Sequence, residues 1–413
     1  MATLRPFRAW RPKDPSKAAD VAAVPYDVVN RDEAAALADQ NPLSFLRVSR
    51  PEIELPQDLN PYAPEVYARV RANWERLIAS APLIRDDRPR LYVYRLKQGA
   101  HVQTGIAATY SIDEYDQDLI RKHEKTRKEK EDDRTRHVLT LEAQTGPVFL
   151  TYPGKPEISA LVEKTTQSAP LYDFVAPDRV THTIWVVNVS APLVAAFKSV
   201  PTLYIADGHH RAASASRARA EMRERNSAHT GAEDYNFVMA VAFPAEELRI
   251  LPYHRVVMDL NGRDEPAFLQ ALETDFQVTP YSSAPIAPSR GEFAMYLARR
   301  WWNLKPHASL KTQIASKTPT ERLDVSMLQE HVLSPLLDIG DPRSDKRIDF
   351  VGGIRGTDEL ERLVQSGRAQ VAFALHPTTV EDLMTISDAG GIMPPKSTWF
   401  EPKLRDGLLS HSL

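Results

Sequence analysis

The residues best suited to chemistry lie in one short stretch, Asp207-Gly208-His209-His210-Arg211. The stretch follows the apolar run 203–206 and precedes an Ala/Arg-rich segment that we expect to be helical to about residue 225. A helix that starts directly after a strand leaves unpaired N–H groups at its positive end, and these bind phosphate. An arginine adds donors suited to the same oxygens. The stretch therefore predicts a polyanion or nucleotide site, and the alternative is an Asp-Gly turn whose histidines merely cap the helix.

A second group of reactive side chains, His123-Glu124-Lys125, opens a strongly charged run at 121–136. A base, an acid and a cation side by side could form part of a site or of a lid over it. Runs in which both signs alternate are more often solvated helices that carry i,i+4 ion pairs. Both interpretations remain open at this stage.

The familiar catalytic signatures are absent from the sequence. There is no Gly-x-Gly-x-x-Gly, Gly-x-Ser-x-Gly or His-Glu-x-x-His. The segment 390–397 matches P-loop spacing except that Pro395 replaces the second glycine. Its two prolines lack the N–H groups that cradle phosphates, so we reject a P-loop there.

Composition narrows the class of protein. The chain has 413 residues, which suggests two or three domains. It has no cysteine, which excludes disulfides, iron–sulfur clusters and thiol nucleophiles. Its formal net charge of −3 argues against a general nucleic-acid coat protein. We expect no signal peptide and no membrane span, and a cytoplasmic location.

Strands and helices that alternate along the chain indicate a mixed α/β (α+β) fold without repeats. A hairpin about Gln98-Gly99 and an amphipathic helix at 64–79 are the clearest local patterns. We expect strands at 43–48, 91–94, 104–112, 147–152, 183–189, 203–206, 236–243, 348–351 and 370–375. We expect helices after Asn30 and at 64–79, 157–167, 264–275, 290–302, 320–333 and 357–367.

Several motifs taken together resemble the bacterial family catalogued as domain of unknown function 1015 (DUF1015). They span residues 5 to about 409 and comprise 24–28, 41–42, 123–126, 133–134, 146–150, 206–211, 252–255 and 394–409. The segment 207–211 is in turn similar to the phosphate-binding box of the ParB/sulfiredoxin fold, in which free serine kinases carry a Gly-His-His-Arg box. The family name itself implies no activity.

The resemblance implies a ParB/sulfiredoxin-like core at 1–260 that carries a β-rich insertion at about 86–180. A C-terminal α/β region at 261–413 would close back on this core. The resemblance also implies a nucleotide-dependent phosphotransferase, with Mg²⁺ and ATP or ADP, that acts on the hydroxyl of free serine or a similar small metabolite.

Phosphoryl transfer requires a carboxylate to accept the hydroxyl proton and positive groups on the phosphates. The related kinases place a catalytic acid on an early loop, which here implies Asp27 as the base; an Asx-turn carboxylate is the alternative. The other implied site residues are His123, Glu124 and Lys125 for catalysis, Gly208, His209, His210 and Arg211 for the phosphates, Asp207 for the metal, and His254, Arg255 and Lys396 as further phosphate-binding groups. Surface or interdomain contacts are the alternative for the last three.

Two other functions remain open. A ParB-like nucleotide-gated DNA-binding or partition factor would use the same box as a switch, but neither a helix-turn-helix nor a basic face is evident. A phosphatase or a phospho-metabolite binding protein could use the same groups without a nucleotide. We expect a nucleotide and a small hydroxyl compound as ligands, and no nucleic acid or membrane partner.

Overall fold

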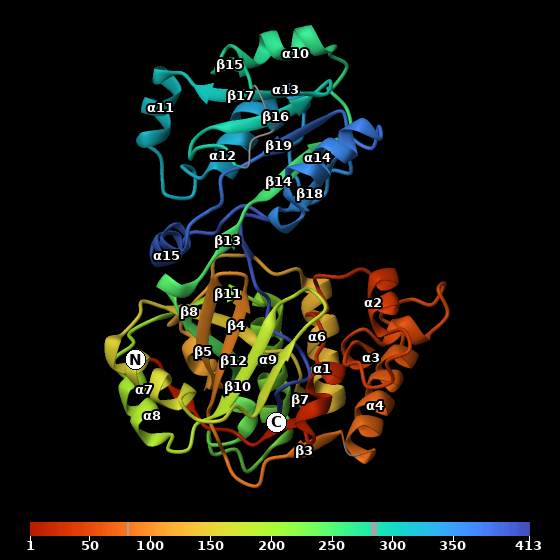
Figure 1. Ribbon diagram of the computed structural model, residues 1–413, viewed down its shortest axis with the longest axis vertical. Coiled ribbons are helices and arrows are strands. Elements are labelled where there is room, and N and C mark those ends of the chain that lie inside the picture. The colour runs from red at the N-terminus through yellow and green to blue at the C-terminus, as the bar shows by residue number, and fades with distance from the viewer. Residues whose placement is uncertain (81, 282–286) are drawn as a thin grey trace. The chain divides into compact units, whose positions relative to one another are not determined.

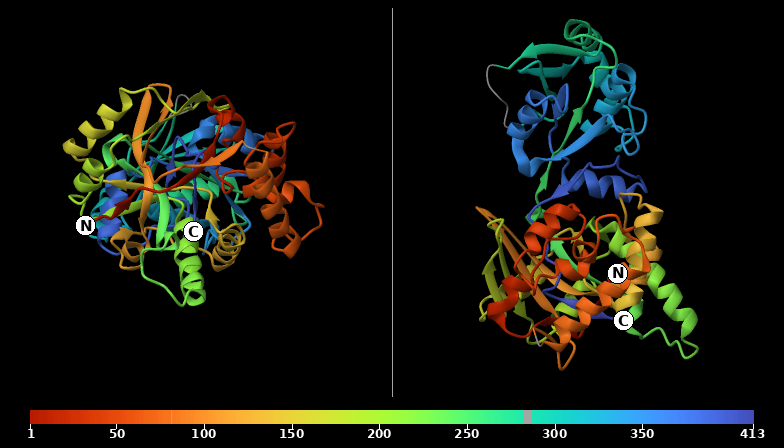
Figure 2. Two further views of the ribbon diagram at one scale, coloured as in Figure 1. Left: turned by 90° about the horizontal axis from the view of Figure 1, so that it is seen from below. Right: turned by 90° about the vertical axis from the view of Figure 1, so that its right-hand side faces the viewer.

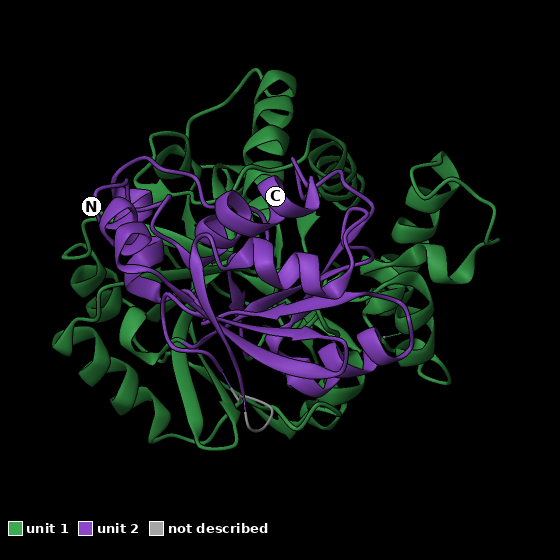
Figure 3. Ribbon diagram, turned by 90° about the horizontal axis from the view of Figure 1, so that it is seen from above, with its two compact units in different colours: residues 1–248, 402–413 green, residues 249–401 purple. Residues whose placement is uncertain are grey.

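The computed structural model describes residues 1–80, 82–281 and 287–413. They form two compact units (Figure 3): unit 1 consists of residues 1–248 and 402–413, and unit 2 consists of residues 249–401. The chain therefore leaves unit 1 after residue 248 and returns to it at residue 402. The predicted core at 1–260 and the predicted insertion at about 86–180 stay predictions.

Unit 1 is built on a nine-stranded sheet (Figure 1). Its strands follow the order β6-β11-β8-β12-β5-β4-β10-β9, and β1 pairs with β5. Most neighbours are antiparallel, but β6 and β11, and also β8 and β12, are parallel. The strands are β1 (Leu4–Arg5), β4 (Tyr92–Gln98), β5 (His101–Ser111), β6 (Ile120–Arg121), β8 (Val148–Tyr152), β9 (Tyr172–Val175), β10 (Thr181–Val186), β11 (Leu203–Asp207) and β12 (Phe237–Pro244).

A smaller sheet in unit 1 joins segments from both ends of the chain. Its order is β3-β2-β21-β7, so the C-terminal strand lies between two strands that precede it by more than half the chain. The strands are β2 (Ala9–Pro12), β3 (Leu83–Arg85), β7 (Ala143–Gln144) and β21 (Ser410–Ser412).

The helices of unit 1 form two groups. Helices α2, α3 and α4 lie together on one side of the unit, away from α7 and α8 (Figures 1 and 2). Helix α9 packs on β8 and β12, α6 packs on α9, and α4 packs on α6. The helices are α1 (Ala18–Val21), α2 (Arg31–Ala38), α3 (Leu46–Ser49), α4 (Pro64–Ala79), α5 (Ile112–Asp116), α6 (Lys128–Leu141), α7 (Pro156–Thr166), α8 (Ala191–Phe197) and α9 (His209–Arg225), with 3₁₀ turns at Pro15–Lys17, Pro51–Glu54, Asp234–Asn236 and Ala245–Glu247.

Local sequence explains the elements that frame the box. Helix α4 buries the apolar face predicted for it, with Val70 and Trp74 in a core that α3 and α6 share. Helix α2 begins with a capping box in which Asn30 and Glu33 satisfy each other's backbone N–H groups. Strand β12 is buried along nearly its whole length, as its continuous apolar sequence predicts. The box follows β11 in this sheet, and α9, which continues from the box, packs on β8 and β12.

Unit 2 contains a six-stranded sheet of order β15-β17-β16-β19-β14-β18 and a two-stranded ladder, β13-β20. Its strands are β13 (Ile250–Leu251), β14 (Tyr253–Val257), β15 (Phe276–Pro280), β16 (Phe293–Leu297), β17 (Arg300–Pro306), β18 (Ile348–Gly352), β19 (Val371–Ala374) and β20 (Trp399–Phe400). Its helices are α10 (Glu265–Leu272), α11 (Ala308–Ala315), α12 (Asp324–Leu328), a π-helix at Gln329–Leu333, α13 (Ser334–Leu337), a 3₁₀ turn at Gly353–Arg355, α14 (Gly356–Gln365) and α15 (Val380–Asp388).

The predicted mixed α/β class is confirmed, but two elements were wrong. The segment 43–48 is not a strand: Leu46 and Val48 belong to α3, and together with Phe45, which precedes the helix, they pack into the helical core. The segment 290–302 is not a helix; it forms the antiparallel strands β16 and β17. Their two-residue turn, Ala298-Arg299, has φ of 47° and 63° without any glycine, so the usual signal of such a turn is missing.

Over the described residues, none of the helices combines the length and the apolar character that a membrane crossing requires.

Candidate functional site

The stretch Asp207–Arg211, which we call the phosphate box for its predicted role, lies where β11 ends and α9 begins, as the sequence predicts. The register of β11 against β8 shifts between Ile205 and Asp207, so the strand is distorted just before the turn. Gly208 follows with φ of +93°, and α9 starts at His209 with no side chain that caps it. A Cβ atom on residue 208 would lie 3.1 Å from Cζ of Arg211. Glycine therefore permits both the left-handed turn and the close approach of the guanidinium.

Arg211 is the central cation of this box. Its Nη2 atom lies 3.0 Å from Oδ2 of Asp207 and 3.8 Å from Oδ2 of Asp27, and its Nη1 donates to the carbonyl oxygen of Pro147. Burial would lower the pKa of the guanidinium, but the carboxylates of Asp27, Asp207 and Asp406 outweigh burial and hold the pKa above its usual value. The Nε atom is buried and makes no hydrogen bond with any described residue. One donor of the guanidinium is therefore uncommitted.

Asp207 is paired with two cations. One carboxylate oxygen contacts Arg211 and the other lies 3.4 Å from Nζ of Lys403. Burial alone would raise the pKa of Asp207, but Lys403 and Arg211 hold it well below the usual range. The carboxylate therefore stays ionised and orients the guanidinium. Its predicted role as a metal ligand stays a prediction.

The two histidines of the box have different surroundings. His209 is buried, and its ring packs edge-to-face on His123 with centroids 4.4 Å apart. His210 accepts a hydrogen bond at Nε2 from the backbone N–H of Arg127, at 3.1 Å. Burial lowers the pKa of both imidazoles, so both are largely neutral at pH 7. They therefore offer hydrogen bonds or metal coordination rather than positive charge.

Asp27 lies on the loop between α1 and α2, and the structure brings it to the box. Its side chain is 34% exposed and faces Arg211. The preceding Tyr26 is buried beneath the guanidinium of Arg134, which lies 4.3 Å from the ring centroid. Arg134 is in turn held by Asp133, with Nε to Oδ2 at 2.8 Å. The loop is thus fixed by α6, and Asp27 is its one acidic group that is open to solvent.

The charged run 121–136 is part loop and part helix. His123 is buried, Glu124 is partly exposed and Lys125 is exposed. Helix α6 begins only at Lys128, and its inner face buries Asp133 and His137. The interpretation of the whole run as a solvated helix is therefore wrong for the inner face of α6, because polar side chains there are held by α4 and by the backbone of α3 at residues 48–49.

Two site residues were missed from the sequence, Lys403 and Asp406. Asp406 exchanges two backbone hydrogen bonds with Ala23, which anchors the C-terminal segment beside the loop of Asp27. Burial raises the pKa of Asp406 to about 7, and Asp27 adds to this, while Arg211 opposes it. The one sequence feature that could have indicated Asp406 is the Asp406-Gly407 pair, which repeats the Asp-Gly of the box. A glycine is needed at residue 407, because its φ is +85° and a Cβ there would lie 2.6 Å from the ring of Phe45.

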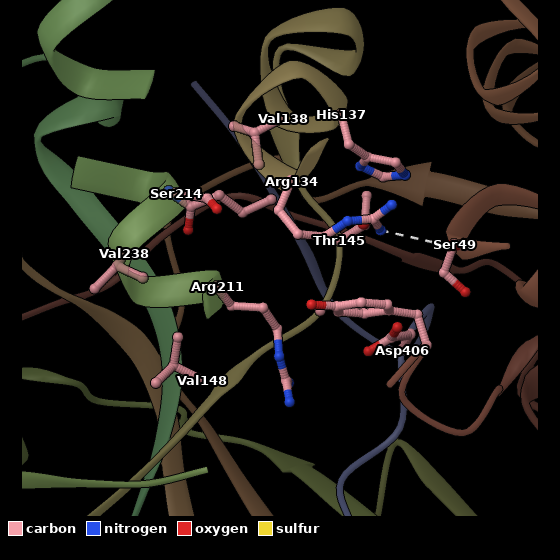
Figure 4. A pocket seen from close by; sticks show the side chains of 13 residues that line it. Ser49, Arg134, His137, Val138, Thr145, Val148, Arg211, Ser214, Val238 and Asp406 are labelled. Atoms are coloured by element: carbon pink, nitrogen blue, oxygen red, sulfur yellow. Dashed lines mark hydrogen bonds between the residues drawn. The ribbon is translucent and has the colours of Figure 1, made fainter. Parts of the chain in front are cut away.

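A narrow cavity of about 40 Å³ separates Arg211 from Asp406 (Figure 4). Figure 4 shows the Arg211 side chain reaching in from α9 and Asp406 from the opposite wall. Tyr26, Arg134, His137 and Ser214 also line it. This volume has room for only a few water molecules. The cavity is thus too small for a nucleotide, whereas Asp27 and Glu124 beside the box are partly exposed.

The remaining predicted residues belong to unit 2. His254 is buried, accepts from the backbone N–H of Leu375 at Nδ1, and has a pKa lowered by burial to about 4. Arg255 is buried, donates to the carbonyl of Tyr253, and has a pKa lowered by burial to about 9. Lys396 lies over the ring of Tyr253, with Nζ 5.3 Å from the centroid. His254 is thus neutral at pH 7, and the contacts described for these three residues are within unit 2.

Comparison with known proteins places the chain in a family. The family model described as "Protein of unknown function (DUF1015)" matches residues 4–326. The chain belongs to the DUF1015 family. The matched span contains the loop of Asp27, the 121–136 run and the whole phosphate box. The search of curated proteins found no match.

The comparison with solved structures found weak similarity to several proteins. A mutant of a free serine kinase in complex with AMP is 13% identical, with a TM-score of 0.37 over 73% of this chain and 92% of that one. SbnI from Staphylococcus aureus is 9% identical, with a TM-score of 0.36 over 72% and 84%. A conserved hypothetical protein from Pyrococcus furiosus is 13% identical, with a TM-score of 0.34 over 73% and 94%. TM-scores this low carry no information about activity.

Proposed function

We propose that this protein is a nucleotide-dependent phosphotransferase that acts on the hydroxyl of free serine or of a similar small metabolite. The observation that carries the proposal is the position of Asp27, whose carboxylate faces Arg211 at 3.8 Å and is 34% exposed. A base that accepts a hydroxyl proton thus lies beside the group that would hold a phosphate. The Gly-His-His-Arg sequence of the box, similar to that of free serine kinases, supports the choice of substrate.

The phosphates would bind at the start of α9. The first N–H groups of that helix have no side-chain cap, and the helix dipole adds positive potential there. His210 and the guanidinium of Arg211 would add neutral and charged donors. Positioned donors of this kind stabilise charge that develops on a transferred phosphoryl group.

ATP or ADP with Mg²⁺ is the proposed donor. Mg²⁺ binds carboxylates and phosphate oxygens, and when bound it would neutralise charge on the phosphates. Both oxygens of Asp207 are already close to cations, so Mg²⁺ at Asp207 would have to displace Lys403. Mg²⁺ would therefore be held mainly through phosphate oxygens and its own water, and Asp27 would keep its role as the base.

The test is an assay for phosphoserine by ³¹P NMR, with ATP or ADP, Mg²⁺ and free serine. Asp27→Asn keeps the size of the side chain but removes the base, so turnover should fall by roughly 10²–10⁴-fold while nucleotide affinity changes little. Asp58→Asn, at an exposed position elsewhere in unit 1, is the matched control and should keep full activity.

The outcomes separate the proposal from its alternatives. Turnover by Asp27→Asn above about a tenth of wild type would remove Asp27 from the mechanism, given the usual contribution of such groups. Release of phosphate from phosphoserine without nucleotide would indicate a phosphatase. Binding of CTP together with DNA, without serine phosphorylation, would indicate the ParB-like alternative.

A further inference from the structure

Two buried imidazoles and a carboxylate converge beside the phosphate box. One ligand atom from each of His123, Glu124 and His209 lies within 4.8 Å of the others. His123 is 2% exposed and His209 is 6% exposed, whereas the side chain of Glu124 is 43% exposed. Nδ1 of His209 lies 3.9 Å from Oε2 of Glu124. The cluster thus has two sides closed by protein and one side open to solvent.

His123 is unusual among buried polar side chains. Neither of its ring nitrogens makes a hydrogen bond of ordinary geometry with any part of the chain that the structure describes. Leaving such a group unsatisfied in the interior costs free energy, so it calls for a partner. An imidazole placed in this way can offer the lone pair of one ring nitrogen to a metal ion.

We propose that His123, Glu124 and His209 form a binding site for a divalent transition-metal ion, with Zn²⁺ as the reference case. Two imidazoles and one carboxylate are a known donor set for zinc in sites that keep one position open. Ligand atoms around tetrahedral zinc lie about 3.4 Å apart, since metal–ligand bonds are about 2.1 Å. The three ligand atoms lie within 4.8 Å of one another, so the widest pair would have to close by up to about 1.4 Å around a bound ion.

The chemistry of the ligands distinguishes this site from a magnesium site. Mg²⁺ prefers oxygen donors and keeps much of its water, whereas imidazole favours zinc, cobalt and nickel. One contact opposes the metal: the backbone N–H of His123 donates to Nε2 of His209, at 3.4 Å. That bond is long; a metal at Nδ1 places the ring proton on Nε2, so the bond would be lost and coordination would have to outweigh it. The proposal goes beyond the phosphotransferase activity and does not depend on it.

A Co²⁺ titration of the full chain tests the site directly, without nucleotide or serine. Co²⁺ substitutes for zinc and gives visible absorption bands when nitrogen and carboxylate ligands surround it in low coordination. We expect saturation at one Co²⁺ per chain, displacement by Zn²⁺ and persistence in excess Mg²⁺. Saturating Zn²⁺ should also raise the midpoint of thermal unfolding, because it binds the folded chain.

Three variants locate the ion. Glu124→Gln removes a charged ligand at a partly exposed position, and we expect it to weaken Co²⁺ binding by about tenfold or more. His123→Asn should abolish the absorption bands. His229→Asn is the matched control: Nδ1 of His229 lies 3.1 Å from Glu233, a pair with no second imidazole, so its loss should leave the titration unchanged.

Two results would overturn the proposal. The first is the absence of a saturable Co²⁺ spectrum in the folded wild type. The second is a spectrum that Glu124→Gln leaves unchanged, which keeps the test decisive even if His123→Asn does not fold. Nucleotide affinity measured by calorimetry in the presence of a chelator separates this site from the phosphate box, because the box should bind whether or not Co²⁺ does.

Discussion

Arg211 stands among three carboxylates, those of Asp27, Asp207 and Asp406, and each of them raises its pKa. A buried guanidinium and its partners have lost hydration, so removal of one member leaves charges that nothing compensates. The arginine therefore has two roles that a substitution would affect together. It would bind an anion, and it holds the loop of Asp27, the end of β11 and the loop at Pro147 in register.

We predict that Arg211→Ala both weakens binding and destabilises the fold. Loss of the charge-assisted donors should lower nucleotide affinity by about tenfold or more. Loss of the buried ion pairs should lower the free energy of unfolding by about 3–5 kcal/mol, measured by urea titration. Arg219→Ala, on the same helix, removes ion pairs to Asp113 and Asp116 and should cost about 0–1 kcal/mol each without any effect on affinity. Unchanged affinity in folded Arg211→Ala would contradict the assignment of the box.

Asp406 predicts a pH dependence of stability. Its pKa in the folded chain is raised from 3.8 to about 7, so the folded state holds a proton that the unfolded state releases. This contribution to stability is complete below pH 3.8 and is lost as the pH rises to about 7. Asp406→Asn mimics the protonated carboxyl and does not titrate. Relative to wild type, the free energy of unfolding of the variant should therefore rise by on the order of 1 kcal/mol per pH unit across this window. Above pH 7 the difference between the two proteins should stay constant.

Urea unfolding at a series of pH values measures this difference between the two proteins. Histidines with lowered pKa values titrate in both proteins, so they cancel when the curves are subtracted. Parallel curves from pH 4 to 7.5 would show that Asp406 is not protonated in the folded chain.

At the scale of elements, α6 decides how far the charged run can move. The helix packs on both α9 and α4, and it buries Asp133, which accepts from the hydroxyl of Tyr67 at 2.8 Å. Only the part that precedes α6 lacks such packing, apart from His123 and the bond from Arg127 to His210. The first turn of α6, residues 128–130, is also largely exposed. A lid would therefore be restricted to roughly residues 124–130, a shorter segment than the run itself.

We predict that hydrogen exchange slows in this segment when nucleotide and serine are both present. The backbone N–H of Arg127 should be the clearest reporter, because it already donates to a histidine of the box. The second half of α6 should exchange slowly with or without ligands, since its backbone is covered on two sides. Equal hydrogen-exchange rates at 124–130 with and without the ligands would show that the segment is a solvated surface and not a lid.

The elements that could be predicted from the sequence are those whose signals are local. The strand, the Asp-Gly turn and the long helix of the box follow one another within one stretch, so periodicity and turn chemistry place them correctly. The hairpin of β16 and β17 was not predicted, because its turn consists of Ala298 and Arg299 and lacks the glycine that usually marks such a turn. Lys403 and Asp406 were not predicted as site residues for a different reason. They are brought to the box by the pairing of β21 with β2 and β7, and no local sequence pattern predicts a contact between segments so far apart in the chain.

At the scale of the whole molecule, unit 2 is inserted into unit 1 through two adjacent strands. The N–H of Glu401 donates to the carbonyl of Arg249 at 3.2 Å, and β13 pairs with β20 directly beyond them. Unit 1 has its own apolar cores, one under the nine-stranded sheet and one among α2, α3 and α4. Unit 1 thus has the features of a domain that can fold by itself.

We predict that unit 1 folds when residues 250–400 are replaced by a short Gly-Ser linker. The adjacency of Arg249 and Glu401 means that the linker closes a small gap. The product should unfold cooperatively in urea and should retain the dispersed amide NMR spectrum of a packed domain. A product that binds a hydrophobic dye and unfolds without a cooperative transition would show that unit 1 depends on unit 2.

The return of the chain at residue 402 also sets the order in which the molecule is made. Ribosomes deliver residues 402–413 only after all of unit 2 has been synthesised, yet Lys403, Asp406 and β21 belong to unit 1. A nascent chain that already carries Arg211 lacks the strand between β2 and β7 and the lysine that pairs with Asp207. A chain that stops before residue 402 therefore has an unpaired strand edge between β2 and β7, and Asp207 lacks its lysine partner. We expect such an incomplete chain to be more sensitive to proteases than a chain that includes β21.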